Sequence, residues 1–220
     1  MRPLLILMSL VVTIAAQDAK APNELFREGV EAFFAAKPKE SVAAFDQLLA
    51  LAPDSKPQLW QRGLSLYYAG EFQEGREQFE THQTYNTNDV ENAVWHFLCV
   101  ARLEGVAAAR MALIPIEGDP RIPMKQVHDL FAGKGSAADV LAAATTGDDK
   151  AQRNQLCYAH LYLGLYFEAL GDTDRAKEHI LKAANDYRMD HYMGRCAQVH
   201  AKIRGWSVTP AQKGIPPSSD

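Results

Sequence analysis

Cysteine and histidine are the side chains whose types and spacing could support chemistry in this 220-residue chain. Each of the three cysteines has a histidine three or four residues away, so the two side chains of a pair would share one face of a helix. Thiolate and imidazole bind zinc and copper, and pairs on neighbouring helices could together complete a metal site. The three pairs are His96 with Cys99, Cys157 with His160, and Cys196 with His200.

Two other interpretations of these cysteines stay open. The spacing matches no known metal motif and the sequence has no Cys-x-x-Cys pair, so the six side chains could be packed core. A disulfide between Cys157 and Cys196 on adjacent helices is the second alternative, and it would leave one thiol over. The sequence therefore assigns no metal ligand and no cofactor, and a metal-binding protein or metal-dependent enzyme remains an alternative function.

The common catalytic motifs are absent from the sequence. It contains no Gly-x-Ser-x-Gly elbow, no phosphate-binding loop and no His-Glu-x-x-His. Glu91 and His96 could form an acid–base pair only in an unusual fold. Asp172 and Asp174 suit a helix start, where carboxylates complement the helix dipole. We therefore expect a protein that is not an enzyme.

A repeat of 34 residues supplies the elements that must position these side chains, and 34 is the period of tetratricopeptide repeats. A glycine in the first helix of each unit lets the second helix approach closely, and an aromatic of the second helix fills the space beside it. Because neither helix buries its apolar stripe alone, the units must stack. The positions that recur at this interval are Gly29 and Gly63, Ser41 and Gly75, and Phe45 and Phe79.

A third copy of the unit covers 157–187, with Gly164, Ala176 and Ile180 at the corresponding positions and Asp172 as a helix cap. Between the second and third copies the pattern is degenerate and predicts only short helices. Their expected ranges are 90–103, 106–113, 124–131 and a helix that begins at Ser136, with Ser136 as its cap and Asp139 three residues on.

Tyrosine and phenylalanine recur at helical spacing, and no segment of any length shows the alternation of a strand. The sequence therefore predicts helices and no sheet. A last helix over 190–203 is expected to cap the exposed end of the stack. The fold class is therefore all-α: a tetratricopeptide-type solenoid of helical hairpins with a degenerate middle and a C-terminal capping helix.

The N-terminus predicts export. Arg2 precedes the uncharged apolar run 4–14 and small residues follow, which is the pattern of a signal peptide over 1–16. The run is shorter than the roughly 20 apolar residues that cross a bilayer. No membrane span is expected after cleavage, although an uncleaved N-terminal anchor stays an alternative. We expect a repeat domain over 17–206, a disordered tail over 207–220, and a periplasmic or secreted location.

The charge balance argues against nucleic acid as a partner. The formal net charge is −4, from 23 basic and 27 acidic side chains, and no basic cluster stands out. A protein that binds the phosphate backbone usually presents a basic face.

The order of parts resembles the NlpI family of bacterial lipoproteins with tetratricopeptide repeats. The likeness runs over about 23–205, and it includes the broken middle between two good repeats. It implies a periplasmic adaptor that binds an envelope protease or peptidoglycan hydrolases, without catalytic residues of its own. The lipid-attachment cysteine of that family is missing here. The segments that carry the resemblance are SVAAFDQLLALAP, RGLSLYYAGEFQEGREQF, ENAVWHFLCVARLEG, FAGKGSAADVLAAA and HLYLGLYFEALGDTDRAKEHILKAA.

The first helix of each pair should line the concave face of such a stack, where aromatic side chains are typical of protein-binding surfaces. Trp60 and Tyr68 are the strongest candidates because they fall outside the repeat's own packing positions. About half of the stripe must be core between repeats, and a homodimer surface in a self-associating scaffold stays an alternative. The predicted binding residues are Arg27, Phe34, Trp60, Leu64, Tyr67, Tyr68, Trp95, His96 and Tyr158, beside Val30, Phe33, Leu161 and Leu165.

Overall fold

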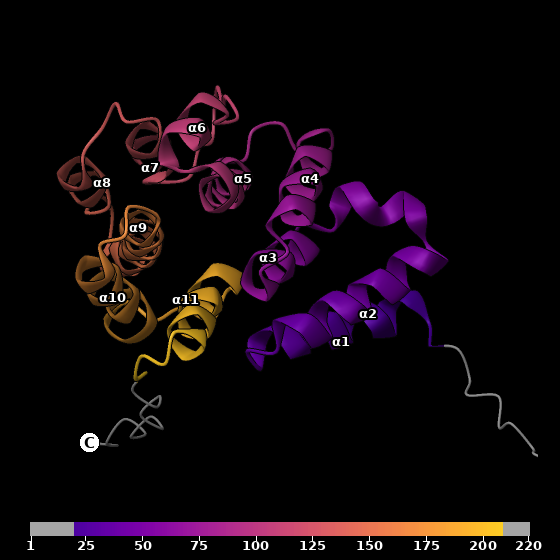
Figure 1. Cartoon of the computed structure of the whole chain (residues 1–220). Helices are drawn as coiled ribbons and strands as arrows, with labels where there is room; N and C mark the ends of the chain where they lie inside the picture. The colour runs from indigo at the N-terminus through magenta and orange to yellow at the C-terminus, as the bar shows by residue number, and fades with distance from the viewer. Residues whose placement is uncertain (1–19, 209–220) are drawn as a thin grey trace, which may run out of the picture.

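The computed structural model describes residues 20–208, and these residues form helices joined by short loops, with no strand (Figure 1). The all-α prediction is therefore confirmed. The expected signal peptide over 1–16 lies outside the described residues, as does the predicted tail from 209 onwards. Within 20–208 no helix is both long and apolar enough to cross a membrane.

The helices follow one another around an arc, and most pack on their neighbour in the chain, while α7 packs on α5 rather than on α6 (Figure 1). Most are helical pairs joined by tight turns, and a 3₁₀ turn and a π-helical turn, η1 and η2, complete the order. Their bounds are α1 Pro22–Phe34, α2 Pro38–Leu51, η1 Pro53–Gln58, α3 Trp60–Ala69, α4 Phe72–Gln83, α5 Val90–Glu104, α6 Val106–Met111, α7 Met124–Phe131, α8 Ala137–Ala143, α9 Asp149–Ala169, α10 Thr173–Leu181, η2 Lys182–Asp186 and α11 Tyr192–Ile203.

Three helical pairs, α1–α2, α3–α4 and α9–α10, cross at a glycine. A Cβ added to Gly29 would lie 2.7 Å from the ring of Phe45, and one added to Gly63 would lie 2.6 Å from the ring of Phe79. Gly164 meets Ile180 at 2.6 Å in the same way, and in each pair the partner stands sixteen residues further along the chain. The predicted equivalence of Gly29 and Gly63 is confirmed.

Local capping explains why several helices begin where the sequence predicted. Ser136 and Asp139 form a reciprocal cap at the start of α8, and the Asp172 carboxylate accepts the Arg175 amide at the start of α10. One boundary was wrong: α9 begins at Asp149, capped by Asp148, so it extends about two turns before the predicted third copy.

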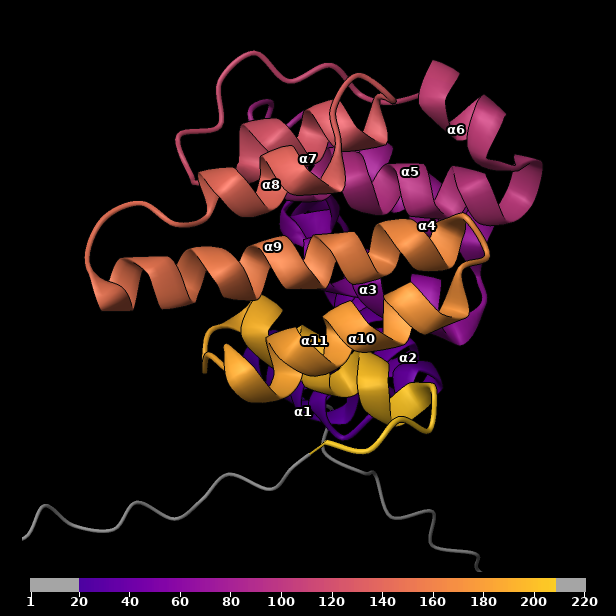
Figure 2. The same cartoon turned by 90° about the vertical axis from the view of Figure 1, so that its left-hand side faces the viewer.

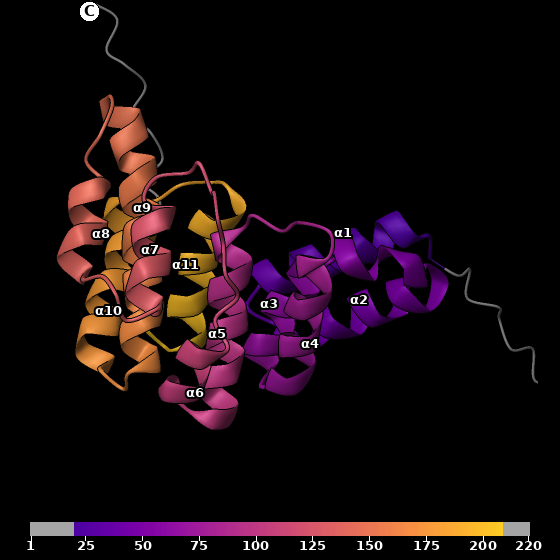
Figure 3. The same cartoon turned by 90° about the horizontal axis from the view of Figure 1, so that it is seen from above.

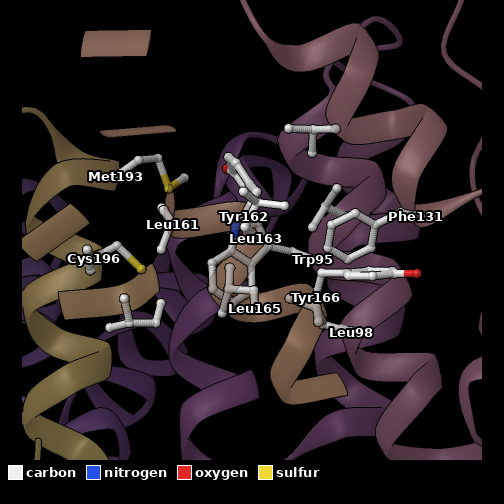
Figure 4. Packing of buried hydrophobic residues seen from close by; sticks show 14 of the residues in the cluster. Trp95, Leu98, Phe131, Leu161, Tyr162, Leu163, Leu165, Tyr166, Met193 and Cys196 are labelled. Carbon is white, nitrogen blue, oxygen red and sulfur yellow. The ribbon is translucent and has the colours of Figure 1, made fainter. Parts of the chain in front are cut away.

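Within the degenerate middle, α7 and α8 pack as a second layer over α5 and α9 (Figure 2). Phe131 of α7 is the link, with its ring centroid 5.0 Å from Phe97 of α5 and 5.2 Å from Tyr166 of α9. The main core runs through this region. Figure 4 shows Trp95 at its centre, with Met193 and Cys196 of α11 on one side and Phe131 on the other.

Helix α11 does more than cap the end of the stack, which corrects the prediction. One flank packs beside α9 and α10, as a last layer would. The other flank lies against α1 and α3 inside the arc (Figures 1 and 3). Tyr192 sits there between three rings, with centroid distances of 5.7 Å to Phe33, 4.7 Å to Phe34 and 4.7 Å to Trp60. Lys202 donates to the Ala35 carbonyl at 2.9 Å.

Candidate functional site

Most of the predicted concave-face residues are not free, because α11 and the core cover them. Arg27 is exposed, and Phe34, Trp60 and Tyr158 are half-buried. The other five are buried, so they do not form an open binding surface in this structure: Leu64, Tyr67, Tyr68, Trp95 and His96.

Of the two strongest candidates, Tyr68 is part of the core and Trp60 is partly accessible. The Tyr68 hydroxyl is 2.9 Å from Nδ1 of His200 on α11, and burial lowers the pKa of that imidazole to about 4. Neutral His200 therefore anchors α11 to α3. Trp60 stands at the start of α3 and reaches a pocket described below.

The Cys/His pairs do not converge. Across residues 20–208 no group of three or more histidine, cysteine, aspartate or glutamate side chains is placed to hold a metal ion. The three cysteines are buried free thiols, so the alternative of a Cys157–Cys196 disulfide is wrong for this structure. Each histidine has another partner: His96 contacts Glu80 at 3.2 Å, and His160 contacts His179 at 2.7 Å.

A pocket of about 200 Å³ opens where α4, α5 and the start of α11 meet. The turn before α5 and the loop before α7 supply its charged side, and the tryptophans supply its apolar side. Its lining residues are Trp60, Phe79, His82, Asp89, Glu91, Asn92, Trp95, Arg121 and Met193.

Three carboxylates surround one guanidinium beside this pocket. Arg121 contacts Asp119 at 2.5 Å, Asp89 at 2.6 Å and Glu91 at 3.1 Å. Burial raises the pKa of Glu91 to about 7, and Asp89 and Asp119 add to the rise, while Arg121 opposes it. Asp119 keeps a lowered pKa because hydrogen bonds from Arg121 outweigh its own burial. Three carboxylates therefore face a single cation, the guanidinium of Arg121.

Several polar atoms of the pocket lining have no hydrogen-bond partner among the described residues. They are Oε1 of Glu91, Oδ1 of Asn92 and Nε1 of Trp95. The ion-pair contact of Glu91 with Arg121 lacks hydrogen-bond geometry. The amide nitrogen of Asn92, in contrast, donates to the Phe79 carbonyl and to Gln83, which fixes the orientation of its oxygen.

A larger and more open groove, of about 640 Å³, lies between the end of α1 and α11. No acidic side chain lines this groove, so its cations have no counter-charge within it. The guanidinium of Arg195 stacks 3.5 Å above the ring of Phe34. The lining residues are Phe34, Arg188, Arg195, Gln198, Val199, Lys202, Gly205, Trp206, Ser207 and Val208.

Sequence reasoning singled out Glu91 only as a possible partner of His96, and it missed the other charged residues of both sites. Asp119 and Arg121 stand in a loop without a periodic pattern, and only Asp89 offered a signal, as a helix cap directly before Val90. The groove was detectable in part, because Arg195 and Lys202 lie two turns apart on one predicted helix. No protein-family model and no curated protein matches this sequence, so its function must be inferred from its own residues.

Proposed function

We propose that this protein is an exported, non-enzymatic adaptor of the tetratricopeptide type. It binds an acidic polypeptide segment of a partner in the groove between α1 and α11. An envelope protease or a peptidoglycan hydrolase is the partner class that the family resemblance implies. The observation that carries the proposal is the groove itself, which combines an aromatic floor with cations and no anion.

The repeated glycine crossing supports the tetratricopeptide assignment. A small residue opposite each crossing glycine accompanies it: the Ser41 hydroxyl donates to the Gly29 carbonyl at 2.6 Å, and Gly75 lies against the Gly63 carbonyl. Scaffolds of stacked helical pairs act through the extended surfaces that they present. This is the kind of activity expected of an adaptor.

The chemistry of the groove favours a peptide with carboxylates beside apolar side chains. Arg188 and Arg195 form no ion pair with a described residue, so their charge is available to a partner. Phe34 and Trp206 are half-buried and offer ring faces next to them. Aromatic and arginine side chains together are typical of the residues that dominate binding energy at interfaces.

The test uses the full chain and two labelled peptides that alternate glutamate or glutamine with phenylalanine. Fluorescence anisotropy should show binding of the glutamate peptide, weakened by added salt as expected for exposed charges. The Arg195→Glu variant should lose affinity by about tenfold or more, since it replaces attraction by repulsion.

Lys177→Glu on α10 is the matched control, because it makes the same charge change at an exposed site outside the groove. Equal binding of the two peptides, or an Arg195→Glu variant that binds like wild type, would contradict the proposal. Affinity purification from envelope extracts with wild type and Arg195→Glu would then identify the physiological partner as the protein lost from the variant.

A further inference from the structure

We propose that the pocket between α4, α5 and α11 is a second binding site, specific for a primary ammonium group. The group is carried either by a small free amine or by a lysine side chain of a bound protein. This inference goes beyond the adaptor function, because it concerns different residues and the opposite charge from the groove.

The buried polar atoms of the pocket define the first requirement for its ligand. Asn92 is 3 % exposed, and its Oδ1 has no hydrogen-bond partner among the described residues. Glu91 is 9 % exposed, and its Oε1 accepts no hydrogen bond, although it forms the ion pair with Arg121 at 3.1 Å. Burying a polar group without a hydrogen-bond partner costs free energy. A ligand that donates hydrogen bonds to these oxygens removes that cost, which makes its binding free energy more favourable. Both oxygens are acceptors when Glu91 is ionised, which calls for a ligand that donates.

His82 adds a further acceptor. Its Nδ1 lies 2.7 Å from the Pro57 carbonyl, and since a carbonyl only accepts, Nδ1 carries the proton. In a ring that carries only this proton, Nε2 is an acceptor. An ammonium group has three donors and no acceptor, which matches the oxygens of Glu91 and Asn92 and this nitrogen, while the indole N–H of Trp95 would stay unpaired.

The charge of the site defines the second requirement. Arg121 faces three carboxylates, so the cluster has more negative than positive charge once Glu91 ionises. With Glu91 ionised, three carboxylates and one guanidinium carry a net charge of −2, so one additional cation would reduce the excess to −1 and would favour the ionised form of Glu91. A metal ion is disfavoured because the described chain places no three suitable ligands together.

The size and the aromatic wall define the third requirement. A volume of about 200 Å³ holds a short aliphatic chain but no large organic ligand. Trp60 is half-buried, lies against Tyr192 and lines the pocket, so an indole ring is available to a cation. Met193 adds apolar surface for the methylene groups that lead to the ammonium.

The test is calorimetric titration of the full chain with n-butylammonium and with Nα-acetyl-lysine amide. The neutral control is Nα,Nε-diacetyl-lysine amide, which lacks the charge. Both amines should bind saturably and the diacetyl compound should not. The Glu91→Gln variant should bind both amines about tenfold more weakly or worse. Glu117→Gln, an exposed carboxylate outside the pocket, should bind like wild type.

Proton release provides a readout that a purely structural role of Glu91 would not move. With a pKa of about 7, Glu91 is partly protonated at neutral pH, and a bound cation should expel that proton. The binding enthalpy of wild type should therefore depend on the ionisation enthalpy of the buffer, and that of Glu91→Gln should not. The charged and titratable groups that act on Glu91 are Arg121, Asp89, Asp119, Tyr158 and Tyr162.

The two amines also separate the two sources of the ammonium. Tighter binding of the lysine amide supports a protein side chain, and equal or tighter binding of butylammonium supports a small free amine. Binding of the neutral diacetyl compound, retention of affinity in Glu91→Gln, or binding of magnesium or calcium in place of both amines would overturn the proposal. The Glu91→Gln variant should bind the glutamate peptide in the groove as tightly as wild type does. The experiment therefore distinguishes a failure of the ammonium proposal from a failure of the adaptor proposal.

Discussion

At the scale of single residues, the crossing glycines set how closely the helices approach. Gly29, Gly63 and Gly164 each face a side chain at a distance that leaves no room for a methyl group. Such a position is specified by packing, not by backbone conformation, because none of the three has a positive φ. Glycine is therefore required because a side chain of the partner helix fills the space that a Cβ would take.

Gly63→Ala tests this reading. In a helix, alanine normally stabilises relative to glycine by up to about 1 kcal/mol. Here its methyl group would meet the Phe79 ring at 2.6 Å, and we expect a net loss of about 1–3 kcal/mol from overpacking. Urea unfolding followed by circular dichroism measures the change. Gly118→Ala, which meets nothing within 4 Å, should be close to neutral; a stabilised Gly63→Ala would disprove the close crossing.

Glu91 should make stability depend on pH in an identifiable window. Its folded pKa of about 7 lies above the value near 4.3 of an unfolded chain, so the folded protein retains a proton that the unfolded chain releases. Stability therefore falls as pH rises from about 4.5 to about 7. Over that window the free energy of unfolding of wild type should fall by at most about 3 kcal/mol relative to that of the Glu91→Gln variant. Urea unfolding of both proteins at both ends of the window tests this, and parallel curves would contradict it.

At the scale of elements, α11 is the helix on which the arrangement of the binding sites depends. It supplies Arg195 and Lys202 to the groove and Met193 to the pocket, and Tyr192 stands between the two. Its anchors join residues far apart in the chain. Tyr68 bonds to His200, and Arg204 of the same end bonds to Glu168 of α9.

Tyr68→Phe should loosen α11 without removing its apolar packing. The change leaves the fully buried Nδ1 of His200 without its partner, at a cost of about 1–2 kcal/mol. Hydrogen exchange should accelerate in α11 more than in α4. The matched control is Tyr85→Phe, whose ring is 62 % exposed. Unchanged protection of α11 would show that this hydrogen bond does not hold it.

The repeat helices could be predicted from the sequence because their signals are local. The caps at Ser136 and Asp172 are recognised within one turn, and Gly63 and Phe79 stand sixteen residues apart on consecutive helices. The position of α11 and the pocket beside it could not be predicted. Both depend on which surfaces the curved stack brings together, as with Tyr68 and His200, and no periodic pattern encodes such a distant contact.

At the scale of the whole molecule, the described residues form an arc whose interior is occupied by α11 (Figure 1). Inside the arc, the groove and the pocket therefore remain as hollows on either side of α11. The three cysteines lie inside this closed packing, each at most 1 % exposed. Burial raises the pKa of Cys157 and of Cys196 to about 12, so neither thiol ionises at neutral pH.

Thiol reactivity should accordingly report opening of the molecule. Native protein should react with iodoacetamide far more slowly than urea-unfolded protein, and a reducing agent should leave the thermal midpoint unchanged. If α11 detaches first, Cys196 should react before Cys99, and mass spectrometry of the labelled peptides would show the order. Rapid labelling of all three cysteines in native protein would contradict their burial.

The position of α11 has a consequence for how the protein is made. The inner flank of α1, the first of the described helices to emerge during synthesis, is covered by Tyr192, which follows Phe33 by 159 residues. The α1–α2 hairpin can therefore form early, but its packing stays incomplete until α11 has been released. A variant truncated before α11 should lose more than that helix, because α1 and α11 cover each other.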